Sequence, residues 1–328
     1  MKRILVTGGA GYVGARLIPE LVREGYKVNV LDWFIYKPDL FDDLSASVIK
    51  IKGDIRDLSD VRRSLEDVDK VIHLACISND PSAELNKEFT LDVNQNGFKI
   101  LLEACREVNL ERFIFASSSS IYGISDAPDV YEDHPRIPIS LYNISKAWCE
   151  DLLYSKFTDI PFSIIRPATI CGFSDRQRLD LAVNLLTSHA IQNKKMTIFG
   201  GEQHRPNLNI KDMINLYIYF LNIDLDKIIH EVFNASCGNL TINEISSSIS
   251  NVLEPRLGNI EKNWLESDDP RSYRVNSEKL YSLGFQPKFG IEDAVLEIYE
   301  AFQGKKISGD VKDPLYNNVQ MMKSLQLK

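Results

Sequence analysis

The segment VTGGAGYVG, residues 6–14, restricts the possible folds more than any other part of the sequence. A short apolar, β-rich run precedes it, and a stretch with helical spacing follows it. Gly8, Gly11 and Gly14 suit a sharp turn, a close approach of the backbone to a pyrophosphate, and tight packing of a helix on a strand. The segment therefore predicts a strand–turn–helix unit that binds a dinucleotide, with the phosphates at the helix N-terminus.

Strand and helix patterns alternate through the first half of the chain. Such alternation implies right-handed crossovers and a parallel sheet with helices on both faces. We therefore predict an α/β fold with a Rossmann-type, doubly wound parallel sheet. The expected strands are 3–6, 27–31, 48–51, 70–74, 112–116 and 162–166, and the expected helices between them include 15–24, 58–65 and 88–107.

The alternation stops after about residue 170. Helical patterns follow at about 180–193, 211–221 and 291–303, with strand-like pieces MTIF and EVFNA. We expect residues 1–170 to form the Rossmann domain and residues 171–328 to form a smaller, mixed α/β lobe that binds substrate. We also expect residues 205–236 to return to the first domain, and the polar tail from Lys305 to wrap the surface.

Composition narrows the functional class. The net charge of −8 argues against a nucleic-acid partner. The five cysteines contain no CxxC pair and the five histidines are dispersed, so we expect reduced thiols and no metal site. No apolar run approaches the ~20 residues of a membrane span, and no signal peptide is evident at the N-terminus. A cytoplasmic enzyme or binding protein without a membrane partner is expected.

Asp32 indicates which dinucleotide binds. It ends the expected second strand, 18 positions beyond Gly14, where a carboxylate would accept both ribose hydroxyls and repel a 2′-phosphate. NAD is therefore favoured over NADP; the alternative is that Asp32 only caps a loop. The cofactor residues predicted up to this point are Gly8, Gly11, Tyr12, Val13, Gly14, Asp32, Asp54, Ile55, Leu74 and Ala75.

A tyrosine and a lysine form the candidate catalytic pair. Tyr142 and Lys146 are four residues apart, so they share one face of a helix. The lysine charge, together with that of an oxidised nicotinamide, would lower the pKa of Tyr142 and let the phenolate accept a proton from a hydroxyl. A YxxxK pair alone is common, but this one follows an expected strand that ends in four serines, Ser117–Ser120.

These pieces together resemble the extended short-chain dehydrogenases/reductases, the NAD-dependent nucleotide-sugar epimerase/dehydratase family. The resemblance runs to about residue 290 and implies NAD as cofactor and a nucleotide-diphosphate sugar as substrate. It also implies a homodimer formed through the helices around 88–106 and 143–157. The resemblance adds Asn94, Tyr142, Lys146 and Pro167 to the predicted cofactor site. The segments and residues that carry the resemblance are TGGAGYVG, Asp32, GDIRD, HLA, Asn94, SSSSIYG, YNISK, RPATICG, RPNLNIKD and DDPRSYRVNSEKL.

The resemblance also suggests roles for the serines. Ser118 stands four residues before the tyrosine of IYG, where the family has the hydroxyl that bridges to the reacting sugar oxygen. Family members that eliminate water carry Asp and Glu at the next two positions, and a decarboxylase branch carries Glu at the second. Here these positions are Ser119 and Ser120, whose hydroxyls lack the pKa range that elimination needs. Dehydration at C4 and C6 and decarboxylation are therefore disfavoured.

Arginines are the expected substrate anchors. Arg205 and Arg271 match family positions that grip the diphosphate, which suits the forked guanidinium. Thr169 stands where the family often has asparagine, so the sugar preference stays open. For Arg176 and Arg178, surface ion pairing and anion binding are equally open. The predicted substrate residues are Ser118, Ser119, Ser120, Thr169, Arg178, Asn184, Arg205 and Arg271.

Three functions remain open at this point. The first is a nucleotide-sugar epimerase that acts at a carbinol carbon, most simply C4, through a 4-keto sugar. The second is a net 4-dehydrogenase or 4-keto reductase of the same substrate class. The third is a non-catalytic, NAD-sensing binding protein, although this chain keeps the serine, tyrosine and lysine that such proteins usually lose.

Overall fold

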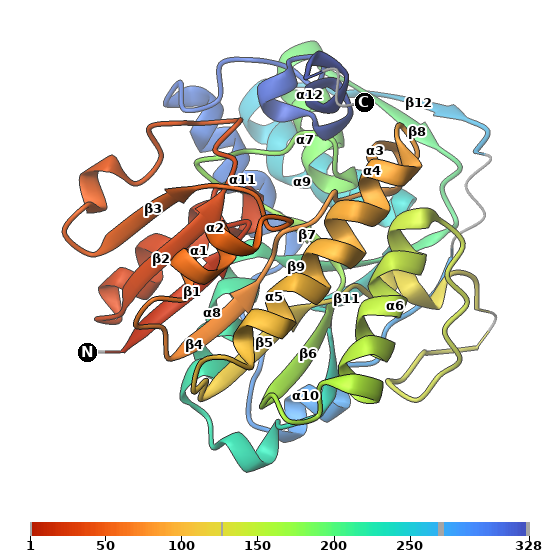
Figure 1. The fold of residues 1–328 in the computed structure, drawn as a ribbon. Helices are drawn as coiled ribbons and strands as arrows, with labels where there is room; N and C mark the ends of the chain where they lie inside the picture. Colours follow the sequence, from red (N-terminus) through yellow and green to blue (C-terminus); the bar gives the residue numbers. More distant parts are fainter. Residues whose placement is uncertain (1, 126, 268–271, 326–328) are drawn as a thin grey trace.

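A seven-stranded parallel sheet forms the centre of the computed structural model, which describes residues 2–125, 127–267 and 272–325 (Figure 1). Every neighbouring pair in the sheet is parallel, in the order β10-β6-β5-β4-β1-β2-β3. The strands are β1 (Arg3–Thr7), β2 (Lys27–Asp32), β3 (Val48–Lys52), β4 (Lys70–His73), β5 (Arg112–Ala116), β6 (Phe162–Pro167) and β10 (Val232–Ala235).

Helices cover both faces of this sheet. Side chains alternate along each strand, so Ile4 and Val6 of β1 join the core on one face and Leu5 joins the core on the other. α1 (Tyr12–Arg23) and α8 (Ile210–Asn222) cover the first face. α2 (Leu58–Ser64), α5 (Gly97–Cys105) and α6 (Leu141–Lys156) cover the second, where α5 and α6 run side by side (Figure 1). The Rossmann-type, doubly wound fold is confirmed.

The predicted helix over 88–107 is divided in the structure. A single π-helical turn, Asp92–Asn96, separates α4 (Lys87–Leu91) from α5. π-Turns of this kind often occur at functional sites, because they re-aim side chains. Here the turn directs Asn94 inward, where it is buried. A short α3 (Asp80–Ala83) precedes α4.

The second half of the chain builds a smaller mixed unit. Its core combines apolar side chains of α7 (Ala182–Asn193), α9 (Ile242–Leu257) and α11 (Ile291–Gln303). Segments of this half also join the large sheet, since β10 pairs with β6 and α8 packs on α1. The division at residue 170 remains a prediction. The small sheets are β11-β9-β7, from β7 (Thr169–Cys171), β9 (His204–Asn209) and β11 (Gly238–Thr241), and β12-β8, from β8 (Lys195–Phe199) and β12 (Glu261–Leu265).

The C-terminal segment contains a helix and buried anchor residues that the sequence analysis did not predict. After α10 (Glu278–Ser282) and α11, the chain passes a short 3₁₀ turn, Pro314–Tyr316, and forms α12 (Asn318–Ser324). Asn318 and Met322 of α12 are 6% and 8% exposed. A mostly polar composition does not reveal such buried anchor residues. The other 3₁₀ turns are Asp42–Leu44, Ser119–Tyr122 and Leu225–Lys227.

Candidate active site

A cleft of about 640 Å³ borders β1 and β4 at the point where the strand order reverses. Ligands of open α/β sheets bind at such a switch point, beyond the carboxyl ends of the strands. Most of the residues predicted from the sequence meet here. They are Gly8, Gly11, Tyr12, Val13, Gly14, Asp32, Ile55, Leu74, Ala75, Ser118, Ser119, Ser120, Tyr142, Lys146, Pro167, Thr169, Arg178 and Arg205.

The glycine turn has the geometry that its sequence predicts. Gly8 has φ +71°, and a Cβ there would lie 2.5 Å from the backbone nitrogen of Ala75. A Cβ on Gly14 would lie 2.3 Å from the carbonyl oxygen of Gly9. Neither position has room for a side chain, so both require glycine. The turn therefore lines the cleft with backbone atoms, and α1 begins at the edge of the cleft. This is a cradle in which a pyrophosphate fits.

Asp32 connects this turn with the loop after β2. Its carboxylate accepts hydrogen bonds from the backbone N–H of Ala10 at 3.0 Å and of Phe34 at 2.8 Å. Burial raises the pKa of Asp32 above its ordinary value, against the effect of these backbone donors and of Arg176. The carboxylate therefore caps the loop, and it also borders the cleft where a ribose would bind. The residues present fit NAD.

The end of β5 and the start of α6 bring the catalytic candidates together. Ser118 precedes the 3₁₀ turn, where its Oγ accepts from the N–H of Ser120 at 3.2 Å and forms a hydrogen bond with Tyr142. The Nζ of Lys146 lies 5.9 Å from the centroid of the Tyr142 ring and donates to the carbonyl oxygen of Ala116 at 2.6 Å. An alcohol, a phenol and an amine thus share one wall of the cleft.

The protein groups alone do not lower the pKa of Tyr142. Burial raises this pKa above its ordinary value, and it outweighs the hydrogen bond with Ser118 and the positive charge of Arg178. The sequence analysis expected a lowered pKa from Lys146 together with an oxidised nicotinamide. The positive charge of Arg178 opposes this rise, and an oxidised nicotinamide would add a further positive charge beside the phenol.

The two hydroxyls after Ser118 have different surroundings. Ser119 lies within 3.3 Å of the hydroxyl of Tyr273, and Ser120 donates to the side-chain oxygen of Asn143 at 2.5 Å. Neither position offers a carboxylate. The carboxylates among the described residues that line the cleft are Asp32, Asp80 and Asp180.

Arg176 and Arg178 are inside the protein, which excludes surface ion pairing for both. Their exposed fractions are 4% and 8%. Arg178 forms a two-pronged ion pair with Asp180, at 2.9 and 3.1 Å. Arg176 stacks on the ring of Tyr36, 3.5 Å from its centroid. Both arginines line the cleft.

Three predicted residues lie outside the lining of the cleft. Asn184 accepts from the N–H of Gly172 at 3.0 Å and donates to the hydroxyl of Tyr12 at 3.0 Å. Asn94 accepts from the N–H of Ile77 at 2.7 Å, and Asp54 pairs with Arg56 at 2.7 Å. These side chains hold the loops of the cleft; direct ligand contacts for them stay predictions. Arg271 lies outside the described residues.

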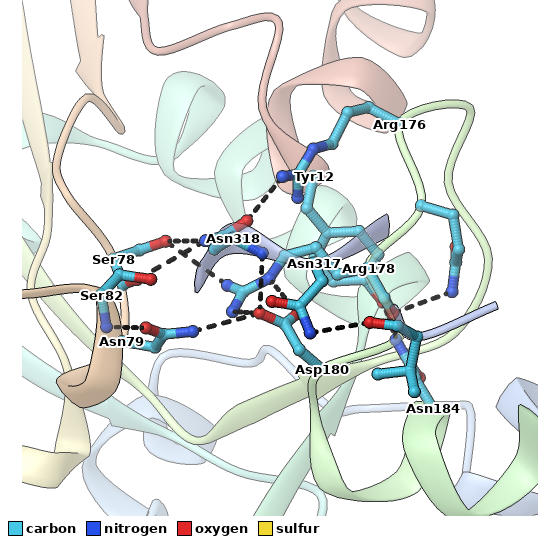
Figure 2. A network of polar contacts seen from close by, with 12 residues as sticks. Tyr12, Ser78, Asn79, Ser82, Arg176, Arg178, Asp180, Asn184, Asn317 and Asn318 are labelled. Carbon is cyan, nitrogen blue, oxygen red and sulfur yellow. Dashed lines mark hydrogen bonds and ion pairs between the residues drawn. The ribbon is translucent and has the colours of Figure 1, made fainter. Parts of the chain in front are cut away.

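The cleft also contains residues that the sequence analysis did not assign to it. They come from the loop after β2, the loop after β4, the connection from β7 to α7, and α12. No motif marks them, because they meet only through the tertiary fold. They include Trp33, Tyr36, Asp180, Asn318 and Met322, and Asp180 and Asn318 belong to the polar network in Figure 2.

Comparison with known families decides the family. The sequence model of the NAD dependent epimerase/dehydratase family matches residues 4–235. The chain belongs to this family. NAD is therefore its cofactor, in agreement with the cradle around Gly8 and Asp32. Within the described part of the chain, no helix has the length and apolar character of a membrane span, and no three metal-binding side chains cluster.

Individual family members divide between two reactions. UDP-glucose 4-epimerase of Lactobacillus helveticus is 29% identical, over 90% of this chain and 94% of its own. Human dTDP-D-glucose 4,6-dehydratase is 27% identical, over 92% and 90%. The solved structure of UDP-glucuronic acid 4-epimerase from Bacillus cereus with UDP-glucuronic acid and NAD is 30% identical, with a TM-score of 0.82, over 92% and 99%. The protein is thus an enzyme of this family, and the reaction must be argued from the site.

Proposed function

We propose that the protein is a nucleotide-sugar 4-epimerase, which inverts C4 of a nucleotide-diphosphate sugar through a 4-keto intermediate. The observation that carries this proposal is the meeting of Ser118, Tyr142 and Lys146 on a cleft wall where hydroxyls follow Ser118. This set supports oxidation and reduction at one carbon and provides no acid–base pair for the neighbouring carbons.

Each residue has a defined task in this proposal. Tyr142 accepts the proton of the C4 hydroxyl during oxidation and returns it during reduction. Ser118, already hydrogen-bonded to Tyr142, shares the hydrogen bond to the same sugar oxygen. Lys146, beside the tyrosine ring, favours the phenolate by its charge. NAD supplies a hydride acceptor and, once reduced, a hydride donor.

The residues next to Ser118 disfavour elimination and decarboxylation. Ser119 and Ser120 occupy the positions next to Ser118, and their hydroxyls are too weak as acids or bases for elimination. The other carboxylates near the reacting end are Asp80, which accepts from Ser140, and Asp180, which is paired with Arg178. Because of these contacts, we assign neither carboxylate the acid–base role that elimination needs.

A diphosphate and a uridine are the proposed recognition elements of the substrate. Arg205 lines the cleft, and its guanidinium, together with that of Arg271, is the proposed anchor of the diphosphate. Relatives named for UDP-glucose and UDP-glucuronic acid make UDP-sugars the first class to test. We also infer a homodimer and, because all five cysteines are free, a cytoplasmic location.

The test is turnover of UDP-glucose and UDP-glucuronic acid by the NAD-bound enzyme, with chromatography of the sugars and absorbance of reduced nicotinamide. An epimerase converts a sugar into its C4 epimer without net accumulation of NADH. Tyr142→Phe should lower this rate by about 10²-fold or more, whereas Tyr154→Phe, at an exposed position of the same helix, should leave it unchanged.

Other results would favour the alternatives. Stoichiometric NADH with a keto sugar would indicate a net dehydrogenase, and consumption of NADH with a keto sugar would indicate a reductase. Binding of NAD without conversion of any nucleotide sugar would indicate a sensing protein. Full turnover by Tyr142→Phe would remove the proposed proton transfer altogether.

A further inference from the structure

The C-terminal segment reaches the dinucleotide end of the cleft, and one buried residue makes the connection. The side-chain oxygen of Asn318 accepts from Tyr36 at 3.1 Å and from Arg176 at 2.5 Å. Its amide nitrogen donates to Ser78 at 2.8 Å, and its backbone N–H donates to Asp180 at 3.1 Å (Figure 2). One side chain thus joins three separate connections of the chain, those after β2, β4 and β7.

The same three connections line the cleft, and two of the residues that Asn318 binds, Tyr36 and Arg176, belong to the part of it near Asp32. Tyr36 follows Asp32 on the loop after β2, and Arg176 stacks on its ring at 3.5 Å. The charge of Arg176 acts on Asp32, and its Nε has no hydrogen-bond partner among the described residues. Burial lowers the pKa of Arg176 to about 10. A stacked cation with a spare donor therefore lies beside the carboxylate that marks the ribose site.

Further contacts anchor the segment on either side of Asn318. Met322 belongs to the same apolar core as Ile55, and both residues line the cleft. Before α12, the carbonyl of Tyr316 accepts from the N–H of Leu179 at 2.9 Å, and that of Gly309 accepts from Gln192 at 2.9 Å. The segment from 308 to 325 is thus held at both ends, and its α12 part, from Asn317 to Met322, borders the cleft.

We propose that residues 308–325 close the dinucleotide end of the cleft and that Asn318 is the positioning residue that holds this closure. The side chain of Asn318 hydrogen-bonds Tyr36, Arg176 and Ser78, so it fixes these three residues of the cleft relative to one another. In this proposal, NAD passes the segment when it enters or leaves the cleft. That this closure supports turnover rests on the proposed epimerase activity, because an epimerase has to keep NAD bound between the two hydride transfers.

The test measures NAD exchange directly, without any sugar. Trp33 lines the cleft, so its fluorescence reports NAD binding and release in stopped-flow experiments. Loss of the hydrogen bonds of Asn318 in Asn318→Ala should raise the association and the dissociation rate constants together, each by about tenfold, and change the Kd by less than about threefold. Lys323→Ala, on an exposed position of α12, should leave both rate constants unchanged.

A second variant removes the hydrogen bond between Tyr36 and Asn318 by changing Tyr36. Tyr36→Phe removes only the hydroxyl that donates to Asn318 and keeps the ring on which Arg176 stacks. Tyr36→Phe should raise the association and dissociation rate constants by a smaller factor than Asn318→Ala does. In the variant that carries both substitutions, the increase should be less than the product of the two single increases. This variant also carries the test if Asn318→Ala fails to fold.

Two results would overturn the proposal. A rise in the dissociation rate constant alone would show that these residues contact NAD without closing over it. Unchanged rate constants in both variants would show that the segment is only structural. Neither readout depends on the sugar reaction, so failure of the closure and failure of the proposed epimerase activity are separable.

Discussion

The carboxylate of Asp32 accepts hydrogen bonds from Ala10 and Phe34 while it borders the cleft. It therefore shapes the glycine turn and presents negative charge to the ribose site with the same group. Sequence position alone suggested one of two roles, a ribose contact or a loop cap. The two are compatible because a carboxylate has several acceptor sites.

Asp32→Asn should weaken NAD binding about ten- to hundredfold, because hydrogen bonds to a charged acceptor are stronger than those to an amide. The ratio between NADP and NAD affinity should also rise, since the charge that opposes a 2′-phosphate is gone. Fluorescence titration with both dinucleotides checks this. Asp39→Asn, at an exposed position of the same loop, is the matched control. Equal NAD affinity in Asp32→Asn would contradict the assignment.

Tyr142 gives a pH dependence with a defined sign. Burial holds its pKa above the ordinary value in the protein without NAD, and the positive charge of oxidised nicotinamide opposes this effect. Below the pKa of Tyr142 in the NAD-bound enzyme, the fraction of phenolate grows as the pH rises. Oxidation of the sugar hydroxyl should therefore become faster as pH rises. Single-turnover reduction of bound NAD, followed by absorbance, checks the slope. A rate that falls as the pH rises through the neutral and alkaline range would contradict a phenolate base.

Among the elements, the unit of β1, turn and α1 depends most on small residues. A Cβ on Gly14 would lie 2.3 Å from the carbonyl oxygen of Gly9, so Gly14→Ala forces the helix away from the strand. We expect a loss of about 1–3 kcal/mol in the free energy of unfolding. Gly238→Ala, where a Cβ meets nothing within 4 Å, should change it by less than about 0.5 kcal/mol. Denaturant unfolding of both variants is the measurement, and equal effects would contradict the packing argument.

The elements differ in how well the sequence predicts them. The parallel strands were predictable because each is a short apolar run bounded by turns and helices. α9 was missed, although its capping box of Thr241 and Glu244 is a recognised start signal. The short strands β7, β9, β11 and β12 were missed as well, because their alternation is weak and their partners are distant in sequence.

At the scale of the whole molecule, exposed apolar side chains bear on the proposed homodimer. The apolar residues of α5 are largely used by the core of the monomer. Exposed ones instead gather before and on α6, at Ile137, Ile139 and Ile144. Of these three, Ile144 lies within 143–157, the second helix of the predicted interface, so its exposed side chain is the one to test.

Ile144→Asp should therefore weaken self-association by about tenfold or more, since a charge in an apolar interface is costly. Phe199→Asp, at an equally exposed apolar position on β8, should have no such effect. Sedimentation velocity over a range of concentrations distinguishes the two variants. A wild-type protein that stays monomeric at all concentrations would contradict the homodimer.

The sequence by itself determined the sheet, the glycine turn, Asp32 and the pairing of Tyr142 with Lys146. Each of these is encoded by neighbouring residues or by a regular period, so local physics is sufficient. The tertiary structure alone decided the environments of Ser117–Ser120, the burial of Arg176 and Arg178, and the return of α12 to the cleft. These depend on contacts between residues far apart in the chain, such as Asn318 with Ser78, and no local pattern records which distant segment will meet another.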